Sequence, residues 1–568
     1  MKIKLLLISV GVSILFFSCS AKQVVVKEES RTTSHNAYYY YILGYEADIS
    51  GKWENALRYY RKALEHDPKS PFLKVQICYM LHRTGDVAGS LSMAEEVIRE
   101  NPDYIPALMV AGEIYNSQNR MDDAINIYKK IVKIDPDNNN AVLFLGTLYY
   151  SNNDFAGAVE TLEGLLAKDP GNLPALDYLG SIYIDKKDYE KAEEYLRRAL
   201  DIRPDSDSVY LKLGLIREIM EKLEDAEENY KKAIHINPHN TRARERLAQV
   251  YIKQKTTEKA IEELEKLKMQ QPENVDIHVR LGMLYFEKKR YDRALDEFRF
   301  SLESNPDNTS IRYYLALVLE EMDRLDDAVI ELRKIISSEP GNTNAFLHIA
   351  YIYTKMKKDG DAIKIYKEIL DFEKNNPEIY LYLSNSYITI KDYQKAEAVL
   401  KEAMSLFKDN DDLYFNLAIV FEKTGRFDEM INLLRKTIAI NPDHADALNY
   451  LGYTFADRNM NLAEAETLIM HALELKPDNG FIIDSLGWLY YRMGKYEDAI
   501  RTLNRAVDIT KDDPVIQEHL GDAYDSAGQS DRAIEAWEKA LEFHEKEEGL
   551  KVRVEKKIRD LKSKSGQK

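Results

Sequence analysis

The chain has 568 residues, of which 45% are hydrophobic and 31% are charged, and this composition is typical of a folded, water-exposed protein. Its formal net charge of -17 argues against binding to duplex nucleic acid, because such binding favours a basic surface. The two cysteines, Cys19 and Cys78, are too few for a disulfide framework.

The first eighteen residues predict a secretory signal. Lys2 and Lys4 precede an apolar run from Leu5 to Phe17, which ends at the small residue Ser18. A short basic segment, an apolar centre and a small residue before the cut describe such a signal. An uncleaved membrane anchor is the alternative, but the run is shorter than the roughly 20 residues that a membrane span needs.

Cys19, directly after the small residue, resembles the lipidated cysteine of a bacterial lipoprotein. The resemblance implies that residues 1–18 are removed and that Cys19 carries a lipid as the mature N-terminus. Ser20, rather than aspartate, follows, which in Gram-negative bacteria implies transport to the outer membrane, facing the periplasm. We therefore expect an outer-membrane lipoprotein of the bacterial cell envelope. Residues 19–36 are mostly polar and are predicted to be a flexible tether.

A repeat of 34 residues organises residues 37–547. Prolines recur at this interval at positions 68, 102, 136, 170, 204, 238, 272, 306 and 340. A fixed period of this length indicates a solenoid, in which each unit buries its apolar face against its neighbours. With proline at the thirty-second position, the first repeat starts at Ala37 and the fifteenth at Pro514.

Three positions of the repeat predict its core. The eighth is small in every repeat, the twentieth is alanine in thirteen repeats, and the eleventh is aromatic in eleven. We expect positions eight and twenty to face each other where the two helices of a repeat approach closely. The aromatic residue is expected to fill the wedge between these helices. Cys78 occupies an eighth position and is predicted to be a packed, inert thiol.

In the third repeat the pattern reads Gly112, Tyr115, Ala124, Tyr128 and Pro136, and this spacing resembles the tetratricopeptide repeat (TPR). The resemblance implies an all-α fold, a right-handed α-solenoid of about fifteen TPR helix-turn-helix units with a C-terminal capping helix. Each proline is expected to end the second helix of its unit, and glycines at 51, 85, 425, 494 and 528 mark the turn inside a unit.

Irregular repeats lie between about 370 and 465. Lys374 and Lys408 replace the proline in two of them, Met430 replaces the alanine in another, and residues 457–461 contain one extra residue. We predict that the solenoid bends or loosens over this segment. Neutral drift in a long array is the alternative.

The last segment, 548–568, is predicted to form the capping helix and a basic tail. Leu550, Val554, Ile558 and Leu561 give one apolar stripe, which suits docking on the last repeat. The other faces are expected to be solvated, and their basic residues are Lys551, Arg553, Lys556, Lys557 and Arg559.

The sequence offers no catalytic or metal-binding pattern. His544-Glu545 has no second histidine four residues after the first, and His235 and His239 flank a helix-ending proline without a cysteine or carboxylate cluster nearby. Neither a phosphate-cradling glycine loop nor a Gly-x-Ser-x-Gly motif is present. We therefore expect no enzymatic activity, no metal and no cofactor.

The TPR resemblance implies that the first helix of each repeat lines a concave groove, with positions six and nine pointing into it. Position six carries three successive cations between aromatic residues. The predicted ligand-binding residues are Lys212, Arg246, Arg280, Tyr178, Tyr314, Tyr382, Tyr450, Tyr453 and Trp488. We expect an extended peptide or polymer with an acidic group near the three cations. Pairing of the cations with neighbours such as Glu218 and Glu245 is the alternative.

These resemblances imply a non-catalytic scaffold, lipid-anchored in the envelope through Cys19, that binds peptides or other envelope proteins during envelope assembly or export. Residues 447–522 also resemble the end of many bacterial envelope repeat lipoproteins. A receptor for a polysaccharide or an unfolded polypeptide is the alternative function.

Overall fold

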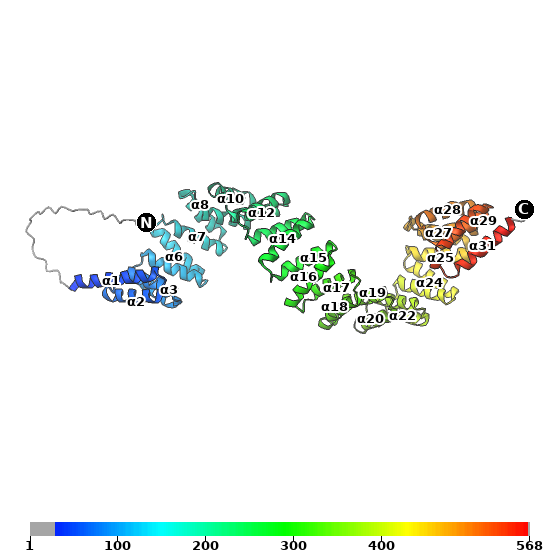
Figure 1. The fold of residues 1–568 in the computed structure, drawn as a ribbon, viewed down its shortest axis with the longest axis horizontal. Helices are drawn as coiled ribbons and strands as arrows, with labels where there is room; N and C mark the ends of the chain where they lie inside the picture. Colours follow the sequence, from blue (N-terminus) through cyan, green and yellow to red (C-terminus); the bar gives the residue numbers. More distant parts are fainter. Residues whose placement is uncertain (1–28, 566–568) are drawn as a thin grey trace, which may run out of the picture. The chain divides into compact units, whose positions relative to one another are not determined.

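A computed structural model describes residues 29–565, and these residues form only helices joined by short turns (Figure 1). Fifteen successive helix pairs are followed by one last helix, which confirms the all-α solenoid with a C-terminal helix. From α2 to α29, the first helix of each pair has 13 residues and the second has 14. The helices divide into two compact blocks, Met1–Pro272 and Glu273–Lys568, and each block is described by itself.

The N-terminal block contains seven helix pairs within the described residues. They are α1 (Glu29–Ile49), α2 (Trp53–His66), α3 (Pro71–Arg83), α4 (Val87–Glu100), α5 (Ile105–Ser117), α6 (Met121–Ile134), α7 (Asn139–Ser151), α8 (Phe155–Lys168), α9 (Leu173–Asp185), α10 (Tyr189–Ile202), α11 (Asp207–Ile219), α12 (Leu223–Ile236), α13 (Thr241–Lys253) and α14 (Thr257–Gln270).

The C-terminal block contains eight helix pairs and the last helix. They are α15 (Val275–Glu287), α16 (Tyr291–Ser304), α17 (Thr309–Glu321), α18 (Leu325–Ser338), α19 (Thr343–Lys355), α20 (Asp359–Phe372), α21 (Pro377–Thr389), α22 (Tyr393–Leu406), α23 (Asp411–Lys423), α24 (Phe427–Ile440), α25 (Ala445–Asp457), α26 (Leu462–Leu475), α27 (Gly480–Arg492), α28 (Tyr496–Ile509), α29 (Pro514–Ser526), α30 (Ser530–Glu542) and α31 (Leu550–Ser565). A short 3-10 turn, His544–Lys546, follows α30.

The predicted tether is too long at its C-terminal end. Residues 29–36 continue helix α1 instead of forming a flexible segment. Extending an existing helix by a residue costs little once the first turn has formed, so the polar residues before Ala37 join the helix that the repeat nucleates. Residues 19–28, including Cys19, lie outside the described residues, as does the predicted signal at 1–18.

The turn inside each repeat contains a residue in the left-handed backbone conformation, as the glycines in the sequence predicted. Gly51, Gly85, Gly425, Gly494 and Gly528 have φ between 70° and 89°. Ten other repeats place asparagine, aspartate, glutamate or lysine at the same point, with φ between 55° and 60°. The extra residue of the thirteenth repeat adds a second left-handed residue, Asn461, before α26. The turn geometry is therefore retained without glycine, although it costs a side chain about 1–2 kcal/mol.

Asparagine after the proline has a role that the sequence pattern alone did not show. In nine repeats an asparagine two residues after the proline position is the N-cap of the next first helix, seven times after proline and twice after Lys374 or Lys408. Its side-chain oxygen accepts a hydrogen bond from an N–H two or three residues further on. Each bond satisfies a helix-end donor that would otherwise lack a partner. Proline and asparagine thus end one helix and start the next.

The small eighth position meets a second residue besides the one expected. A β-carbon on Gly146 would lie 2.6 Å from Cγ of Leu162, and one on Gly112 would lie 2.8 Å from Cε2 of Tyr128. Leu162 and Tyr128 both occupy position twenty-four, and both are buried. Position twenty also meets position eight, as predicted: the hydroxyl of Ser90 donates a hydrogen bond to the backbone carbonyl of Cys78 at 2.8 Å, and a β-carbon on Gly452 would lie 3.2 Å from the backbone oxygen of Ala465. Glycine at position eight in addition makes room for the large side chain at position twenty-four.

The aromatic residue at position eleven joins neighbouring repeats. The hydroxyl of Tyr115 on α5 donates a hydrogen bond to Glu95 on α4, at 2.7 Å, and Tyr251 on α13 donates to Glu227 on α12, at 3.1 Å. In both cases the carboxylate belongs to the second helix of the preceding repeat. The ring therefore contributes to stacking between repeats as well as to the core of its own.

Cys78 lies fully buried in α3, and its backbone carbonyl accepts the hydrogen bond from Ser90 of α4. Burial raises the pKa of its thiol to about 12, which leaves it protonated at neutral pH. This protonation and burial fit the expected inert role.

Helix α31 docks through its predicted apolar stripe, because Leu550, Val554, Ile558 and Leu561 are all buried in one cluster with Trp537 of α30. The basic residues of α31 differ in how exposed they are and in whether they are paired. Arg553 and Lys557 bind the buried carboxylate of Glu518 on α29, and their side chains are 41% and 31% exposed, so they are partly solvated and also hold the helix to the last repeat.

The irregular repeats between about 370 and 465 keep helices of the usual 13 and 14 residues and lie wholly inside the C-terminal block. A bend or loosening of the solenoid in this segment stays a prediction. No helix between residues 29 and 565 combines the length and the apolar character needed to cross a bilayer.

Candidate groove site on the first helices

The predicted groove residues of the N-terminal block lie on consecutive first helices. Tyr178 on α9 is partly exposed and lines a cavity of about 370 Å³ together with Asp177 and Arg203. Lys212 on α11 is half-buried, and its Nζ lies 2.6 Å from Oδ1 of Asp177. Lys212 therefore already has an anionic partner.

Arg246 on α13 is also paired. Its Nη1 lies 3.8 Å from Oε2 of Glu218, a buried carboxylate that also accepts hydrogen bonds from Lys253 at 2.7 Å and from the hydroxyl of Tyr230 at 2.8 Å. This is the pairing with Glu218 that the sequence left open as the alternative. Arg280 belongs to the C-terminal block, where its Nε lies 2.8 Å from Asp276 on the same helix, α15.

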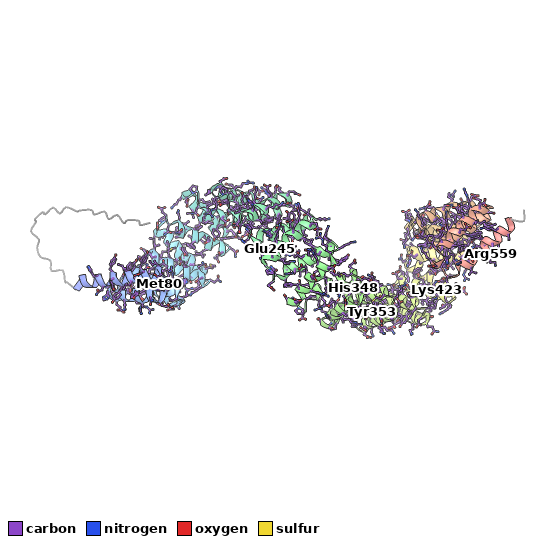
Figure 2. All side chains as sticks on the ribbon, viewed as in Figure 1. Met80, Glu245, His348, Tyr353, Lys423 and Arg559 are labelled. Atoms are coloured by element: carbon purple, nitrogen blue, oxygen red, sulfur yellow. The ribbon has the colours of Figure 1, made fainter. Side chains whose placement is uncertain are left out.

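A larger cavity, of about 800 Å³, lies over α17 and α19 in the C-terminal block. Its lining includes Tyr313 and the predicted residue Tyr314, at positions five and six of α17. From α19 it includes Asn344, His348 and Tyr351, at positions two, six and nine. Figure 2 labels His348 on α19. Tyr351 is 54% exposed, so much of its ring is open to a ligand. The volume of this cavity is about twice that of the cavity beside Tyr178.

The remaining predicted aromatic residues differ in accessibility. Tyr382 on α21 is 44% exposed and its ring stacks on Tyr366, whereas Tyr450 and Tyr453 on α25 are half-buried. Burial, with Glu422 beside Tyr450 and Asp457 beside Tyr453, raises the pKa of both hydroxyls.

Trp488 on α27 does not offer an open surface. It is 8% exposed, its ring stacks on Tyr491 and His519, and its Nε1 donates to Asp457 at 3.3 Å. The larger indole is therefore part of a packed cluster, although the same position holds an exposed tyrosine in α19.

Position five supplies groove residues that positions six and nine alone did not reveal. Asp177 meets Lys212, Asp484 meets His519, and Glu518 meets Arg553, in each case 35 residues apart. The side chain at position six of one repeat thus reaches position five of the repeat before it. An acidic residue followed by a basic residue at this spacing is the signal that could have found these pairs.

His519 on α29 should make the stability of the last repeats depend on pH. Its Nδ1 lies 2.9 Å from Oδ1 of Asp484. Burial opposes the charged ring, but the Asp484 carboxylate, with Glu518 and Asp522 nearby, raises the net pKa of His519 above its usual 6.5. The folded state therefore holds the proton more tightly than the unfolded state. This contribution is complete below pH 6.5 and is lost as the pH rises through the higher folded-state pKa.

We expect amide exchange in α27–α31 to become faster as the pH rises over that interval, after correction for the intrinsic pH dependence of exchange. A His519→Gln variant should lose this pH-dependent component, and the histidine ring signal in NMR should titrate above the usual pKa. Equal corrected pH slopes in the variant and the natural protein would contradict the assignment to His519.

Among residues 29–565, no group of three or more histidine, cysteine, aspartate or glutamate side chains is placed to hold a metal ion. The groove offers aromatic faces, paired charges and hydrogen-bonding side chains. These groups suit binding of an extended chain, because large aromatic side chains give contact area and polar ones fix orientation.

Helix pairs repeated every 34 residues define the class of α-solenoid repeat proteins. Family models described as tetratricopeptide repeat match residues 81–148, 115–182, 149–215, 219–281 and 387–452, and two more with that description match 37–70 and 516–546. A model described as TPR repeat matches 487–528, and one described as the Psidin N-terminal TPR repeats region matches 284–419. The chain belongs to the tetratricopeptide repeat family, whose members are generally non-catalytic scaffolds for protein–protein interaction.

A TPR repeat-containing protein of Pseudomonas aeruginosa is 45% identical over 105 residues, which is 18% of this chain and 18% of that relative. Solved structures are similar at lower identity. The Cut9–Hcn1 hetero-tetramer of the APC/C is 16% identical, with a TM-score of 0.36, over 80% of this chain and 96% of that chain. A TPR protein from Parabacteroides merdae is 18% identical, with a TM-score of 0.34, over 44% and 98%. The assignment of this chain to the family therefore rests on its matches to the family models.

Proposed function

We propose that this protein is a lipid-anchored scaffold of the bacterial cell envelope that binds extended segments of other envelope proteins in its first-helix groove. The observation that carries the proposal is the cavity of about 800 Å³, because it combines the exposed ring of Tyr351 and two half-buried tyrosine rings with hydrogen-bonding side chains along two successive first helices. Such a surface suits a peptide, whose side chains pack on the rings while its backbone accepts and donates hydrogen bonds.

A photo-crosslinking amino acid at Tyr351 tests the binding face. The ring of Tyr351 is open at the cavity, so we expect crosslinks to a small set of envelope proteins in intact cells. Tyr353, on the same helix (Figure 2), is the matched control, because its hydroxyl lies 3.5 Å from Arg333 of α18 instead of lining the cavity. Crosslinks of equal yield at both positions, or none at Tyr351, would count against the groove. Crosslinks to a polysaccharide instead would favour the receptor function.

The proposed lipid anchor is tested by a separate experiment. In a Cys19→Ser variant we expect the protein to leave the membrane fraction, because the thiol that would carry the lipid is gone. Cys78→Ser is the control, since that thiol is buried in α3 and the variant should stay with the membranes. Membrane fractionation and metabolic labelling with an alkyne fatty acid give the readouts. Retention of the Cys19→Ser protein in the membranes, or equal labelling of all three proteins, would reject the anchor.

A further inference from the structure

The cavity over α17 and α19 has an aromatic wall. The ring centroids of Tyr313 and His348 lie 5.4 Å apart, and those of His348 and Tyr351 lie 6.2 Å apart. Tyr314, in the same lining, stacks on Phe298 of α16 at 5.7 Å, which holds its ring in place. The face of an aromatic ring carries partial negative charge and attracts cations.

The charged group of the lining is a carboxylate. Glu339, at the end of α18, accepts hydrogen bonds from the hydroxyl of Thr309 at 2.8 Å and from Nδ2 of Asn342 at 2.7 Å. These two bonds lower the pKa of Glu339, so it is ionised at neutral pH. Among the lining residues that the structure describes there is no lysine or arginine. The charge of the cavity wall is therefore negative.

His348 adds a buried acceptor to the same wall. Only 9% of its side chain is exposed, and its Nε2 lies 2.7 Å from Oε2 of Glu320, whose other oxygen binds Lys355 at 3.0 Å. Burial opposes the ionised form of Glu320, but the bonds from His348 and Lys355 lower its pKa overall. Because an ionised carboxylate only accepts, Nε2 of His348 holds the proton, and in the neutral ring Nδ1 is then an acceptor. Nδ1 is buried and has no hydrogen-bond partner within residues 29–565.

We propose that this cavity is the subsite for a cationic side chain, arginine or lysine, of the bound partner segment. Aromatic faces and an ionised carboxylate both favour a group that carries positive charge and donates hydrogen bonds. Arginine fits better than lysine, because its planar guanidinium stacks on rings and donates in several directions. The inference rests on the proposed function, and it gives the ligand the opposite charge from that expected beside Lys212, Arg246 and Arg280, which are already paired.

Peptide-observed NMR with the full chain tests the charge preference directly. The probes are flexible glycine–serine nonapeptides with arginine, lysine, citrulline or glutamate at the centre, and citrulline keeps the shape of arginine without its charge. We expect the arginine peptide to bind about 5-fold more tightly than the citrulline peptide, and the glutamate peptide to bind most weakly. Tyr351→Ala and Glu339→Gln should each reduce the arginine preference to about 2-fold or less.

Tyr382→Ala is the matched control, because Tyr382 is an exposed tyrosine at position six outside this cavity, and it should leave the preference unchanged. Circular dichroism confirms that each variant keeps its helices. Equal binding of the arginine and citrulline peptides would overturn the proposal. A preference that survives both cavity substitutions would also overturn it, since it would then come from the overall charge of -17.

The two proposals fail in different ways. If partner proteins crosslink at Tyr351 but arginine and citrulline peptides bind equally, the scaffold function stands and the cationic subsite is wrong. If the arginine preference depends on Tyr351 and Glu339 but no partner crosslinks in cells, the subsite is supported and the proposed scaffold function is rejected.

Discussion

Replacing Lys557 with methionine should release helix α31 from the last repeat. Nζ of Lys557 lies 2.7 Å from Oε1 of Glu518, which is buried, and 2.6 Å from Oδ2 of Asp522, whose side chain is 13% exposed. Methionine keeps much of the apolar stem but leaves the two acids without this cation. Removing one partner of a buried ion pair costs about 3–5 kcal/mol. Because Lys557 itself is 31% exposed, we expect a smaller loss, about 2 kcal/mol.

Hydrogen–deuterium exchange of residues 550–565 measures this effect. A loss of about 2 kcal/mol should make local opening roughly 30-fold more frequent, because each 1.4 kcal/mol is about tenfold in an equilibrium constant. Lys556→Met is the matched control on the same helix, since Lys556 is exposed, and it should exchange like the natural protein.

A second substitution identifies the cause. Asp522→Asn removes one of the two negative charges that Lys557 binds and keeps an oxygen for the Trp537 Nε1, which in the natural protein donates to Asp522 at 3.0 Å. We therefore expect Asp522→Asn to restore part of the protection that Lys557→Met removes. Equal exchange in Lys557→Met and Lys556→Met, or no rescue by Asp522→Asn, would show that apolar packing alone holds α31.

Two glycine-to-alanine substitutions in one helix pair should have opposite effects on stability. In α7, the new methyl group of Gly146→Ala would lie 2.6 Å from Cγ of Leu162, which is fully buried and cannot easily move. Overpacking of this kind costs about 1–3 kcal/mol. In α8, Gly164 is exposed and no atom lies within 4 Å of the added carbon. Gly164→Ala should therefore stabilise its helix by up to about 1 kcal/mol.

Amide exchange in α7 and α8 is the appropriate measurement, because a long repeat array need not unfold in a single step. Exchange should be faster than in the natural protein for Gly146→Ala and slower for Gly164→Ala. If both substitutions slow exchange, then Leu162 moves aside without cost, and the close contact between positions eight and twenty-four does not limit the residue at position eight.

The 34-residue period of the sequence predicted most of the fold. Prolines at that spacing located the ends of the second helices, glycines such as Gly51 and Gly85 located left-handed turns, and the stripe from Leu550 to Leu561 located the docking face of the last helix. These features follow from interactions within one helix or one turn, where proline, glycine and periodic apolar residues act on nearby backbone. Such local rules hold before any tertiary contact forms.

The contacts of the groove depended on the packing of helices from different repeats. Of the predicted groove residues, Tyr314 lines a cavity and Tyr382 is exposed, but the spacing did not show that position five lies beside position six of the next repeat. That offset gives Lys212 its carboxylate partner, and the packing around Trp488 leaves it covered.

The sequence by itself determined a tetratricopeptide repeat array, its helix ends and its docked last helix, because each repeat encodes its own helices and turns. Only the tertiary structure decided that Leu162 covers Gly146, that Glu518 binds Lys557, and that tyrosine rings and Glu339 line one cavity. These contacts join residues that are 12 to 39 positions apart in the sequence. Which residues meet depends on how neighbouring helices cross. Helix crossing is set by the fit of whole side-chain surfaces, which a repeat consensus does not specify.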